Sequence, residues 1–300
     1  MIKPQAAIFN SDNSEYYYYL EYKLKPNIVI NEVCEALKKV IDPKETNQVV
    51  AFGKKLWKTL SPQNVPDQLT DFNEMHGVNN THCPSTQNDL FIWLHSEGLD
   101  GHSYNFDQVL NIQNAISSIA DNTLDLMGFK YKDSRDLTGF VDGSANPKED
   151  DRFQVALIPD GEIGAGGSYI LTQKWVHQLN KFHERPEKEQ EQIIGRTKAD
   201  SIELTGDAMP HNSHVSRTDV KVNGVAQKVY RRSAPFGNTQ ESGLYFLSFA
   251  SEQSRHQVQL DHMFGLTDDK VLDRLLEFST PVTSSYWFAP SQKDLENALN

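Results

Sequence analysis

The chain has 300 residues, with 29 lysine and arginine side chains against 41 aspartate and glutamate side chains, so its formal net charge is −12 at pH 7. A hydrophobic content of 38% and a charged content of 23% are typical of a soluble globular protein and argue against a disordered, collagen-like or coiled-coil chain. The acidity argues against a protein that coats nucleic acid or anionic membrane, because such binding depends on lysine and arginine.

No uninterrupted apolar stretch approaches the ~20 residues that a membrane helix needs, and the first residues lack the basic and then apolar order of a secretory signal. We therefore expect a cytoplasmic protein. The cysteines, Cys34 and Cys83, form no CxxC pair and no zinc-type cluster, and in that compartment we expect reduced thiols.

The first half of the chain predicts the order strand, helix, strand, strand, helix, strand. An aromatic run over residues 15–22 is typical of a strand, and the next segment predicts a helix with Asn31 as its N-cap. The later elements are a strand over 49–52, a long polar loop, a strand over 90–95, a helix over 106–120 and an extended segment over 126–131. This order is typical of a ferredoxin-like α+β unit, an antiparallel sheet covered on one face by two helices.

The second half repeats this order with longer insertions. Its elements are a strand over 168–175, a helix over 187–194 opened by Pro186, strands over 228–231 and 244–249, a helix over 251–263 and a closing strand over 285–289. The sequence therefore predicts an α+β fold of tandem ferredoxin-like domains. Because the polar segment over 133–139 is the expected joint, we place the N-terminal domain at residues 1–137 and the C-terminal domain at 138–300.

Motifs of several common enzyme classes are missing from the sequence. The ten histidines include no HExxH pair, so a zinc hydrolase is not supported. There is no GxSxG, no GxxxxGK[ST] and no GxGxxG after a strand. The glycine-rich residues 164–167 precede a strand, whereas a phosphate-binding loop precedes the N-terminus of a helix.

Two segments differ from ordinary core or loop sequence. Residues 139–147 place Asp142 between an apolar pair and a run of small residues, which lets the backbone approach a ligand closely. Residues 213–219 place His214 next to Ser213 and close to Arg217. Taken alone, each segment also has a plain structural interpretation, an Asp-Gly turn for the first and a capping or packed histidine for the second.

In combination, these segments resemble the dye-decolorizing peroxidases. Residues 139–143 match the GxxDG motif of that family, and residues 194–198 resemble its IGRxK segment. Residues 213–219 look like the region of the proximal haem histidine, and residues 229–237 look like the strand of the distal arginine. Residues 243–246 and 281–290 match the C-terminal pattern of the family. The short chain without a twin-arginine signal looks most like the compact bacterial type, often called B.

The resemblance implies a haem peroxidase with one haem b per chain, held by the C-terminal domain. Such an enzyme reduces hydrogen peroxide through an oxoferryl intermediate and oxidises small aromatic donors, such as dyes or phenols, in one-electron steps. The family also implies a homodimer or larger homo-oligomer. The acidity and the lack of an apolar span lead us to expect no nucleic acid and no membrane as partner. Two other classes remain open: a haem-handling protein, either a carrier or an iron-releasing chelatase, and a binding module without haem.

The resemblance assigns the axial iron ligand to His214, while His211 is an alternative on chemistry alone. An axial histidine usually donates its other ring N–H to an acceptor, and a carboxylate there increases electron donation to iron. Asp261, Asp273 and Glu277 are all candidates for that acceptor.

On the opposite side of the haem, the resemblance makes Asp142 the proton shuttle and Arg231 the fixed positive charge. Arg232 is the alternative to Arg231, because neighbouring residues of a strand point to opposite faces. Ser233 would donate a further hydrogen bond on the face of Arg231.

The remaining expected contacts concern the porphyrin. Gly143 and Ser144 are expected to pass close to it. Arg196 is a candidate partner of a haem propionate, because a guanidinium matches a carboxylate with two hydrogen bonds. The alternative for Arg196 is a structural ion pair.

Overall fold

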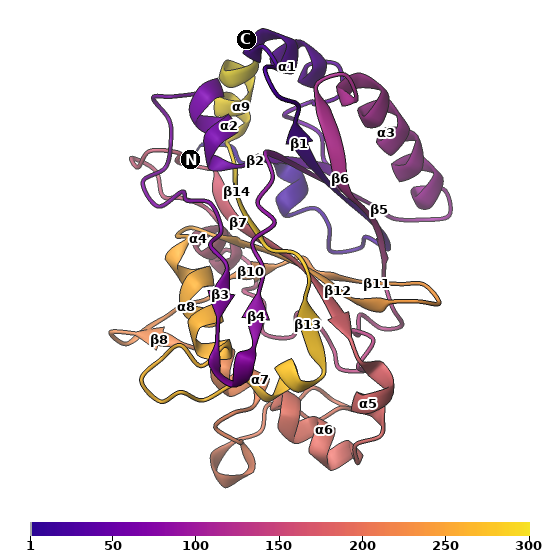
Figure 1. Cartoon of the computed structure of the whole chain (residues 1–300), viewed down its shortest axis with the longest axis vertical. Coiled ribbons are helices and arrows are strands. Elements are labelled where there is room, and N and C mark those ends of the chain that lie inside the picture. Colours follow the sequence, from indigo (N-terminus) through magenta and orange to yellow (C-terminus); the bar gives the residue numbers. More distant parts are fainter. Residues whose placement is uncertain (1) are drawn as a thin grey trace.

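The computed structural model describes residues 2–300, and its main feature is one large antiparallel sheet (Figure 1). The first half of the chain contributes β1 (Tyr16–Leu24), β2 (Gln48–Phe52), β5 (Leu90–Ser96) and β6 (Ala120–Phe129). The second half contributes β7 (Ser168–His177), β10 (Tyr230–Arg231), β11 (Ala234–Gly237), β12 (Ser242–Ala250), β13 (Ser279–Pro281) and β14 (Ser285–Ala289). Both halves therefore build one continuous sheet.

The two halves of this sheet have the same strand order. The first half runs β2-β5-β1-β6 and the second runs β10-β12-β7-β14, so strands in equivalent chain positions occupy equivalent places. The halves join where β14 pairs with β2, with Phe288 opposite Phe52. This repeated order confirms the predicted α+β class of tandem ferredoxin-like units. The division at residues 137 and 138 stays a prediction.

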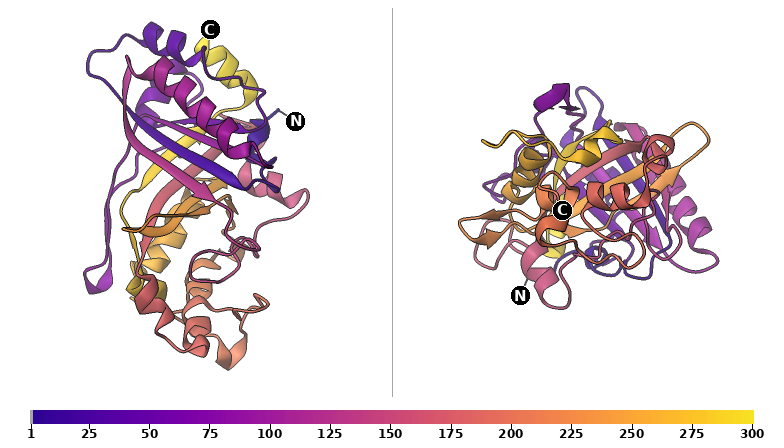
Figure 2. Two further views of the ribbon diagram at one scale, coloured as in Figure 1. Left: turned by 90° about the vertical axis from the view of Figure 1, so that its right-hand side faces the viewer. Right: turned by 90° about the horizontal axis from the view of Figure 1, so that it is seen from below.

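The helices cover opposite ends of the molecule (Figures 1 and 2). On the first half lie α1 (Ile30–Leu37), α2 (Lys54–Leu60), α3 (Gly101–Ile116) and α9 (Gln292–Leu299). On the second half lie α4 (Asp151–Ala156), α5 (Leu179–His183), α6 (Glu187–Ile194), α7 (His214–Thr218) and α8 (Ser254–Met263). Leu295 and Leu299 of α9 belong to the core under α1 and α3, so the last helix completes the first half.

Short elements lie in the connections. They are the 3-10 helices η1 (Ala6–Ile8), η2 (Val78–Asn80), η3 (Gly206–Ala208) and η4 (Arg274–Glu277), and the hairpins β3 (Met75–His76) with β4 (His82–Cys83) and β8 (Lys221–Val222) with β9 (Val225–Ala226). Within residues 2–300, no helix combines the length and the apolar character needed to cross a membrane. Cys34 and Cys83 are free thiols.

Alternate residues of β1 serve two different cores. Leu20 and Tyr22 pack under the helices of the first half, whereas Tyr19 points to the other face and stacks on Tyr245 of β12, with ring centroids 4.1 Å apart. The second core contains residues of both halves, because the sheet curls until β6 lies beside β11. One face of the C-terminal strands therefore packs on the first half, and the other face packs on α8 and on Phe72, Met75 and Cys83.

The predicted element boundaries needed several corrections. Helix α1 has Val29 as its N-cap instead of Asn31 and ends at Leu37. Helix α3 begins at Gly101, five residues before the predicted start at residue 106, because its first turn is polar and shows no apolar periodicity. The predicted long polar loop contains α2 and the hairpin of β3 and β4, whose strands of two residues each are too short to show alternation.

Candidate active site

The turn that carries Asp142 depends on glycine at two positions. Gly139 and Gly143 have φ angles of +94° and +75°, which strain any residue with a Cβ. The backbone N–H of Asp142 donates to the carbonyl of Ser134 over 3.0 Å, and its Oδ1 accepts the N–H of Gly143 over 2.7 Å. These bonds fix the direction of the carboxylate. Its Oδ2 has no hydrogen-bond partner within residues 2–300 and is free to receive one.

Asn146 joins this turn to strand β10. Its Nδ2 donates to the carbonyl of Arg231 over 2.8 Å, and its Oδ1 accepts the N–H of Arg231 over 2.9 Å. The clamp brings Arg231 Nε to 3.9 Å from Asp142 Oδ1, with each side chain 27% exposed. At this separation the two groups attract each other without sharing a hydrogen bond, so both keep hydrogen-bonding capacity for a third molecule.

Asp142 and Arg231 line one cavity of about 190 Å³. Its wall also includes Gly143, Asn146, Ser233, Arg232, Tyr17 and Asp12. Four of the predicted site residues therefore meet here: Asp142, Gly143, Arg231 and Ser233. The Ser233 hydroxyl oxygen accepts the N–H of Leu247 over 3.3 Å, which leaves the hydroxyl proton able to donate.

Arg231 and Arg232 differ in the partners of their charges. Arg232 places Nη2 2.5 Å from Asp12 Oδ1, and its guanidinium lies over the ring of Tyr230 at 4.3 Å from the centroid. The charge of Arg232 is therefore paired with a carboxylate of the first half of the chain. Arg231 is the arginine that lies beside Asp142.

The surroundings of Asp142 raise the pKa of its carboxyl. Burial raises the pKa of this carboxyl above its ordinary value, and the charge of Asp136 raises it further. The charges of Arg231 and His214 act in the opposite direction and are weaker than the effect of burial. Asp142 therefore takes up a proton more readily than an exposed aspartate.

His214 is the first residue of α7, whose N-cap is Ser213. Its Nδ1 lies 2.7 Å from Oδ2 of Asp273, a carboxylate that is completely buried. The other carboxylate oxygen of Asp273 accepts the N–H of Leu275 over 2.8 Å, which fixes the carboxylate. The His214 side chain is 31% exposed, and in the described part of the chain its Nε2 has no hydrogen-bond partner.

The structure selects one of the three carboxylates left open by the sequence. Asp273 holds His214, whereas Asp261 accepts a bond from Gln257 over 2.8 Å and Glu277 lies 3.7 Å from Arg274. Asp273 is therefore the carboxylate that orients the imidazole.

Three other predicted residues are not part of this cavity wall in residues 2–300: His214, Arg196 and Ser144. Arg196 forms an ion pair with Glu203, with 2.5 Å between Nη2 and Oε2, and also donates to the carbonyl of Ser201 over 3.0 Å. Ser144 is exposed, and neither Ser144 nor Arg196 is part of the cavity wall in residues 2–300. His211, the alternative to His214, is exposed.

Sequence reasoning missed the positioning role of Asn146 and the influence of Asp136. Asn146 stands in the run of small residues after the GxxDG motif, and nothing local indicates that it would clamp a strand 85 residues away. Asp136 accepts the N–H of Thr138 over 2.6 Å and lies 3.6 Å from His177 Nε2. Its effect on Asp142 follows only from the folded loop.

Comparison with known proteins identifies the family of this chain. The family model described as the C-terminal part of Dyp-type peroxidases matches residues 133–294, and the N-terminal one matches residues 32–130. The chain is 33% identical over 255 residues to the dye-decolorizing peroxidase of Mycobacterium tuberculosis, which covers 83% of this chain and 75% of that protein. The chain belongs to the Dyp-type peroxidase family.

Solved structures of this family have the same fold. A putative Dyp-type peroxidase of Shewanella oneidensis superposes with a TM-score of 0.90 at 32% identity, covering 98% of both chains. A variant of DypB from Rhodococcus jostii, determined in complex with heme, superposes with a TM-score of 0.87 at 32% identity, again over 98% of both chains. The chain is therefore a peroxidase, an oxidoreductase with the two-part architecture of its family.

Proposed function

We propose that the chain is a haem-dependent peroxidase in which His214 would hold the haem iron and Asp142 and Arg231 would act on hydrogen peroxide. The observation that carries the proposal is that one peroxidase fold contains two polar pairs, His214 with Asp273 and Asp142 with Arg231. His214 is oriented by the buried Asp273, and Asp142 lies beside Arg231 in a cavity.

The residues present fit a haem. A histidine that holds haem iron needs one free ring nitrogen and a hydrogen-bond acceptor for the other. His214 has both, with Nε2 unpartnered in residues 2–300 and Nδ1 bonded to Asp273. The cavity residues Asp142, Arg231 and Ser233 offer an acceptor, a fixed cation and a hydroxyl donor for a small polar ligand. When bound, the haem supplies an iron centre that binds peroxide and stores oxidising equivalents.

Asp142 moves the proton. Cleavage of the bond between the two peroxide oxygens requires that a proton leave one oxygen and reach the other, which then departs as water. The free Oδ2 of Asp142 accepts this proton, and the raised pKa of the carboxyl makes the uptake easier. After transfer to the departing oxygen, the carboxylate is regenerated.

Arg231 stabilises the negative charge that develops on the departing oxygen. Its main chain is held by Asn146, so the guanidinium is positioned before the reaction begins. Ser233 donates a further hydrogen bond from the same wall of the cavity. The proposed donors are small aromatic compounds, which would return two electrons, one at a time, to the oxidised haem.

The finer assignments rest on the family resemblance. We assign one haem b per chain to the domain at residues 138–300, with Gly143 and Ser144 beside the porphyrin. Arg196 would face a propionate only by exchanging its present ion pair with Glu203. The domain at residues 1–137 contributes Asp12 and Tyr17 to the cavity wall. A homodimer or larger homo-oligomer in the cytoplasm is the proposed form of the enzyme.

Stopped-flow mixing of the haem-loaded protein with hydrogen peroxide tests this mechanism. We expect the first absorbance change to slow about 10²–10⁴-fold in Asp142→Ala and about 10²–10³-fold in Arg231→Ala. Arg232→Ala should lose less than Arg231→Ala, because Asp12 already holds the Arg232 charge.

Wild-type rates in both Asp142→Ala and Arg231→Ala would contradict the mechanism. If those variants also convert haem to iron-free porphyrin as fast as the wild type, the haem-handling alternative is correct. The product porphyrin is identified by its absorption and fluorescence, so this outcome is separate from the peroxide kinetics.

A further inference from the structure

A hairpin outside the active site presents three metal-binding side chains on one face. Strands β3 and β4 pair Met75 with Cys83 and His76 with His82. Because side chains alternate along a strand, Met75 and Cys83 point into a core, with 6% and 0% exposure. His76, His82 and Glu74 are on the opposite, exposed face.

The hairpin is fixed at its tip and along its buried face. The N–H of Gly77 donates to the carbonyl of Thr81 over 2.9 Å, and the N–H of Val78 donates to the carbonyl of Phe264 over 3.0 Å. A Cβ on Gly77 would lie 2.4 Å from that Phe264 oxygen, so only glycine fits this contact. The buried Cys83 packs in the core beneath. The hairpin therefore holds its exposed histidines in a defined register.

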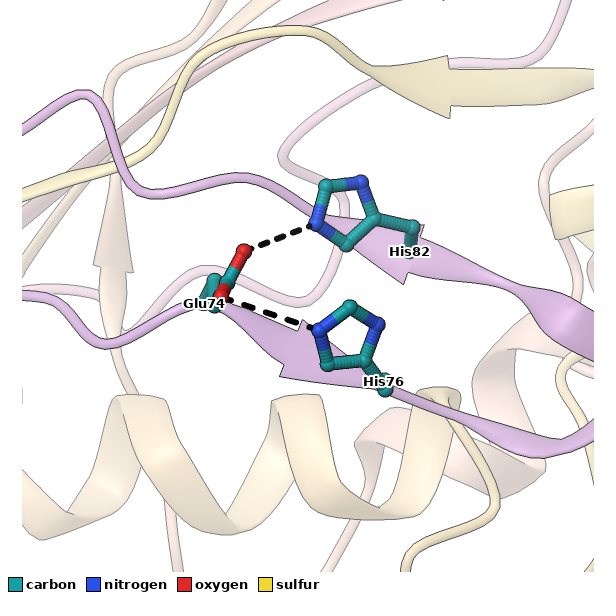
Figure 3. Close-up of side chains that lie close together, drawn as sticks. All are labelled: Glu74, His76 and His82. Atoms are coloured by element: carbon teal, nitrogen blue, oxygen red, sulfur yellow. Dashed lines mark hydrogen bonds and ion pairs between the residues drawn. The ribbon is translucent and has the colours of Figure 1, made fainter.

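The three side chains converge on one point (Figure 3). Glu74 Oε2 lies 3.3 Å from His82 Nε2, and Glu74 Oε1 lies 3.8 Å from His76 Nε2. The imidazole rings stack with centroids 4.9 Å apart, and one donor atom from each residue lies within 4.8 Å of the others. Donors bound to a tetrahedral zinc ion at about 2.0–2.1 Å are separated by roughly 3.4 Å, so small side-chain movements complete the site.

The geometry points to a binding site for one divalent transition-metal ion at Glu74, His76 and His82, with Zn²⁺ as the representative ion. Two imidazoles and one carboxylate are the ligands that borderline ions such as Zn²⁺, Ni²⁺ and Cu²⁺ prefer, and they leave a fourth position for water. Mg²⁺ and Ca²⁺ prefer oxygen ligands. Cu⁺ prefers sulfur, and the Cys83 thiol lies on the opposite, buried face of the hairpin.

The bound ion would join the two strands of the hairpin. Glu74 and His76 precede the tip and His82 follows it, so the ion closes the hairpin from its exposed side. The tip already contacts Phe264 at the end of α8, which places the ion at a junction between the two halves of the chain. Metal binding should therefore stabilise this junction. The site shares no residue with the proposed haem site at His214.

Isothermal titration of Zn²⁺ into the full haem-loaded chain, after dialysis against a chelator, tests the site. We expect one Zn²⁺ per chain, with binding at least about tenfold weaker in His76→Gln, His82→Gln and Glu74→Gln, because even an outer-sphere partner contributes about 10–100-fold to metal affinity. His102→Gln, an exposed histidine of α3, is the matched control and should bind as the wild type does.

A crystal grown with Zn²⁺ should also show anomalous scattering between the three side chains at the zinc absorption edge. Because His76 and His82 are 71% and 46% exposed, the glutamine variants should keep the wild-type melting temperature in the absence of metal. Equal Zn²⁺ affinity in the His76→Gln/His82→Gln double variant would overturn the proposal. So would a wild-type dissociation constant above about 1 mM.

Discussion

Strand β5 of the first half carries His95, and helix α7 of the second half carries His214. The hydrogen-bond partners of these two histidines are very different. His95 is 2% exposed, and both of its nitrogens are engaged, with Nδ1 2.8 Å from Ser14 Oγ and Nε2 3.0 Å from the carbonyl of Ala7. His214 has one nitrogen on a buried carboxylate and the other unpartnered in residues 2–300. A histidine with both nitrogens satisfied is structural, whereas one that is oriented and half free is able to bind a metal.

The same contrast holds for the strands. All five residues of β2 are buried, whereas β10, its equivalent in the second half, has two residues and presents Arg231 to a cavity. The first half uses its strand positions to fill cores. In the second half, the turn of Asp142 and the clamp of Asn146 replace part of that packing. Equivalent topology therefore places the proposed catalytic pair, Asp142 and Arg231, in only one half.

The largest expected effect is on the rate of the reaction with peroxide when Asp142 is replaced. The control is Asp12, a carboxylate of the first half that lines the same cavity. A protonated carboxyl cannot accept a proton, so the rate of the wild-type reaction with peroxide should fall as pH falls through the raised pKa of Asp142. Asp142→Asn should be about 10²–10⁴-fold slower and lack this acid limb. Asp12→Asn should keep the limb. Stopped-flow rates at a series of pH values measure both, and an acid limb in Asp142→Asn would reject the assignment.

The next effect concerns the carboxylate that orients His214. Asp273→Asn should weaken haem binding by about 10–100-fold, because second-shell partners of metal ligands contribute this much to affinity. The control is Asp261→Asn, whose carboxylate bonds Gln257 instead. Titration of the haem-free chain with haem, followed in the visible spectrum, measures the affinity. Equal loss in both variants would show that Asp273 has no special role.

Acid stability offers a comparison between buried histidines of the two halves. Burial lowers the pKa of His95 to about 4 and that of His256, which is stacked on Tyr286, to about 3. The unfolded chain binds protons on both histidines below pH 6.5, so stability is lost as pH falls from 6.5 toward those values. His256 alone should account for about 2 kcal/mol between pH 7 and pH 5.

Urea unfolding at pH 7 and at pH 5, for the wild type and for His256→Phe, measures how much unfolding free energy is lost through protonation of His256. The variant should lose about 2 kcal/mol less on acidification, because the proton uptake of His95 remains and that of His256 is removed. An unchanged difference between pH 7 and pH 5 would mean that His256 is not buried in its neutral form.

The smallest expected effect comes from the clamp on β10. Asn146→Ala removes both hydrogen bonds to the main chain of Arg231 and should slow the reaction with peroxide about tenfold by misplacing the guanidinium. Haem content should not change, because Asn146 does not contact His214. Asn122→Ala, an exposed asparagine of β6, is the control. A wild-type rate in Asn146→Ala would show that Arg231 is positioned by its strand alone.

The repeated fold was predictable from local pattern. Strands β7, β12 and β14 carry apolar runs, and α6 spans the predicted residues 187–194 with Pro186 as its N-cap. The candidate site came from motifs whose residues lie far apart in the sequence, and the structure brings Asp142 and Arg231 together through a cavity.

Two features of the structure could not be predicted from local sequence pattern, because they depend on contacts between distant segments. The choice of Asp273 over Asp261 and Glu277 is decided by η4, where Asp273 caps Leu275 and turns its second oxygen toward His214. The convergence of His76 and His82 depends on a hairpin of two-residue strands. Neither relation has a periodic or spacing signal in the sequence.

The visible absorption spectrum of the purified chain tests the central claim most directly, through His214→Ala and the nearby control His211→Ala. The account predicts a Soret band in the wild type and in His211→Ala, and its loss or a large shift in His214→Ala, because His214, unlike the exposed His211, is oriented by a buried carboxylate. An unchanged Soret band in His214→Ala would contradict the assignment of the axial ligand and the division of roles between the two halves.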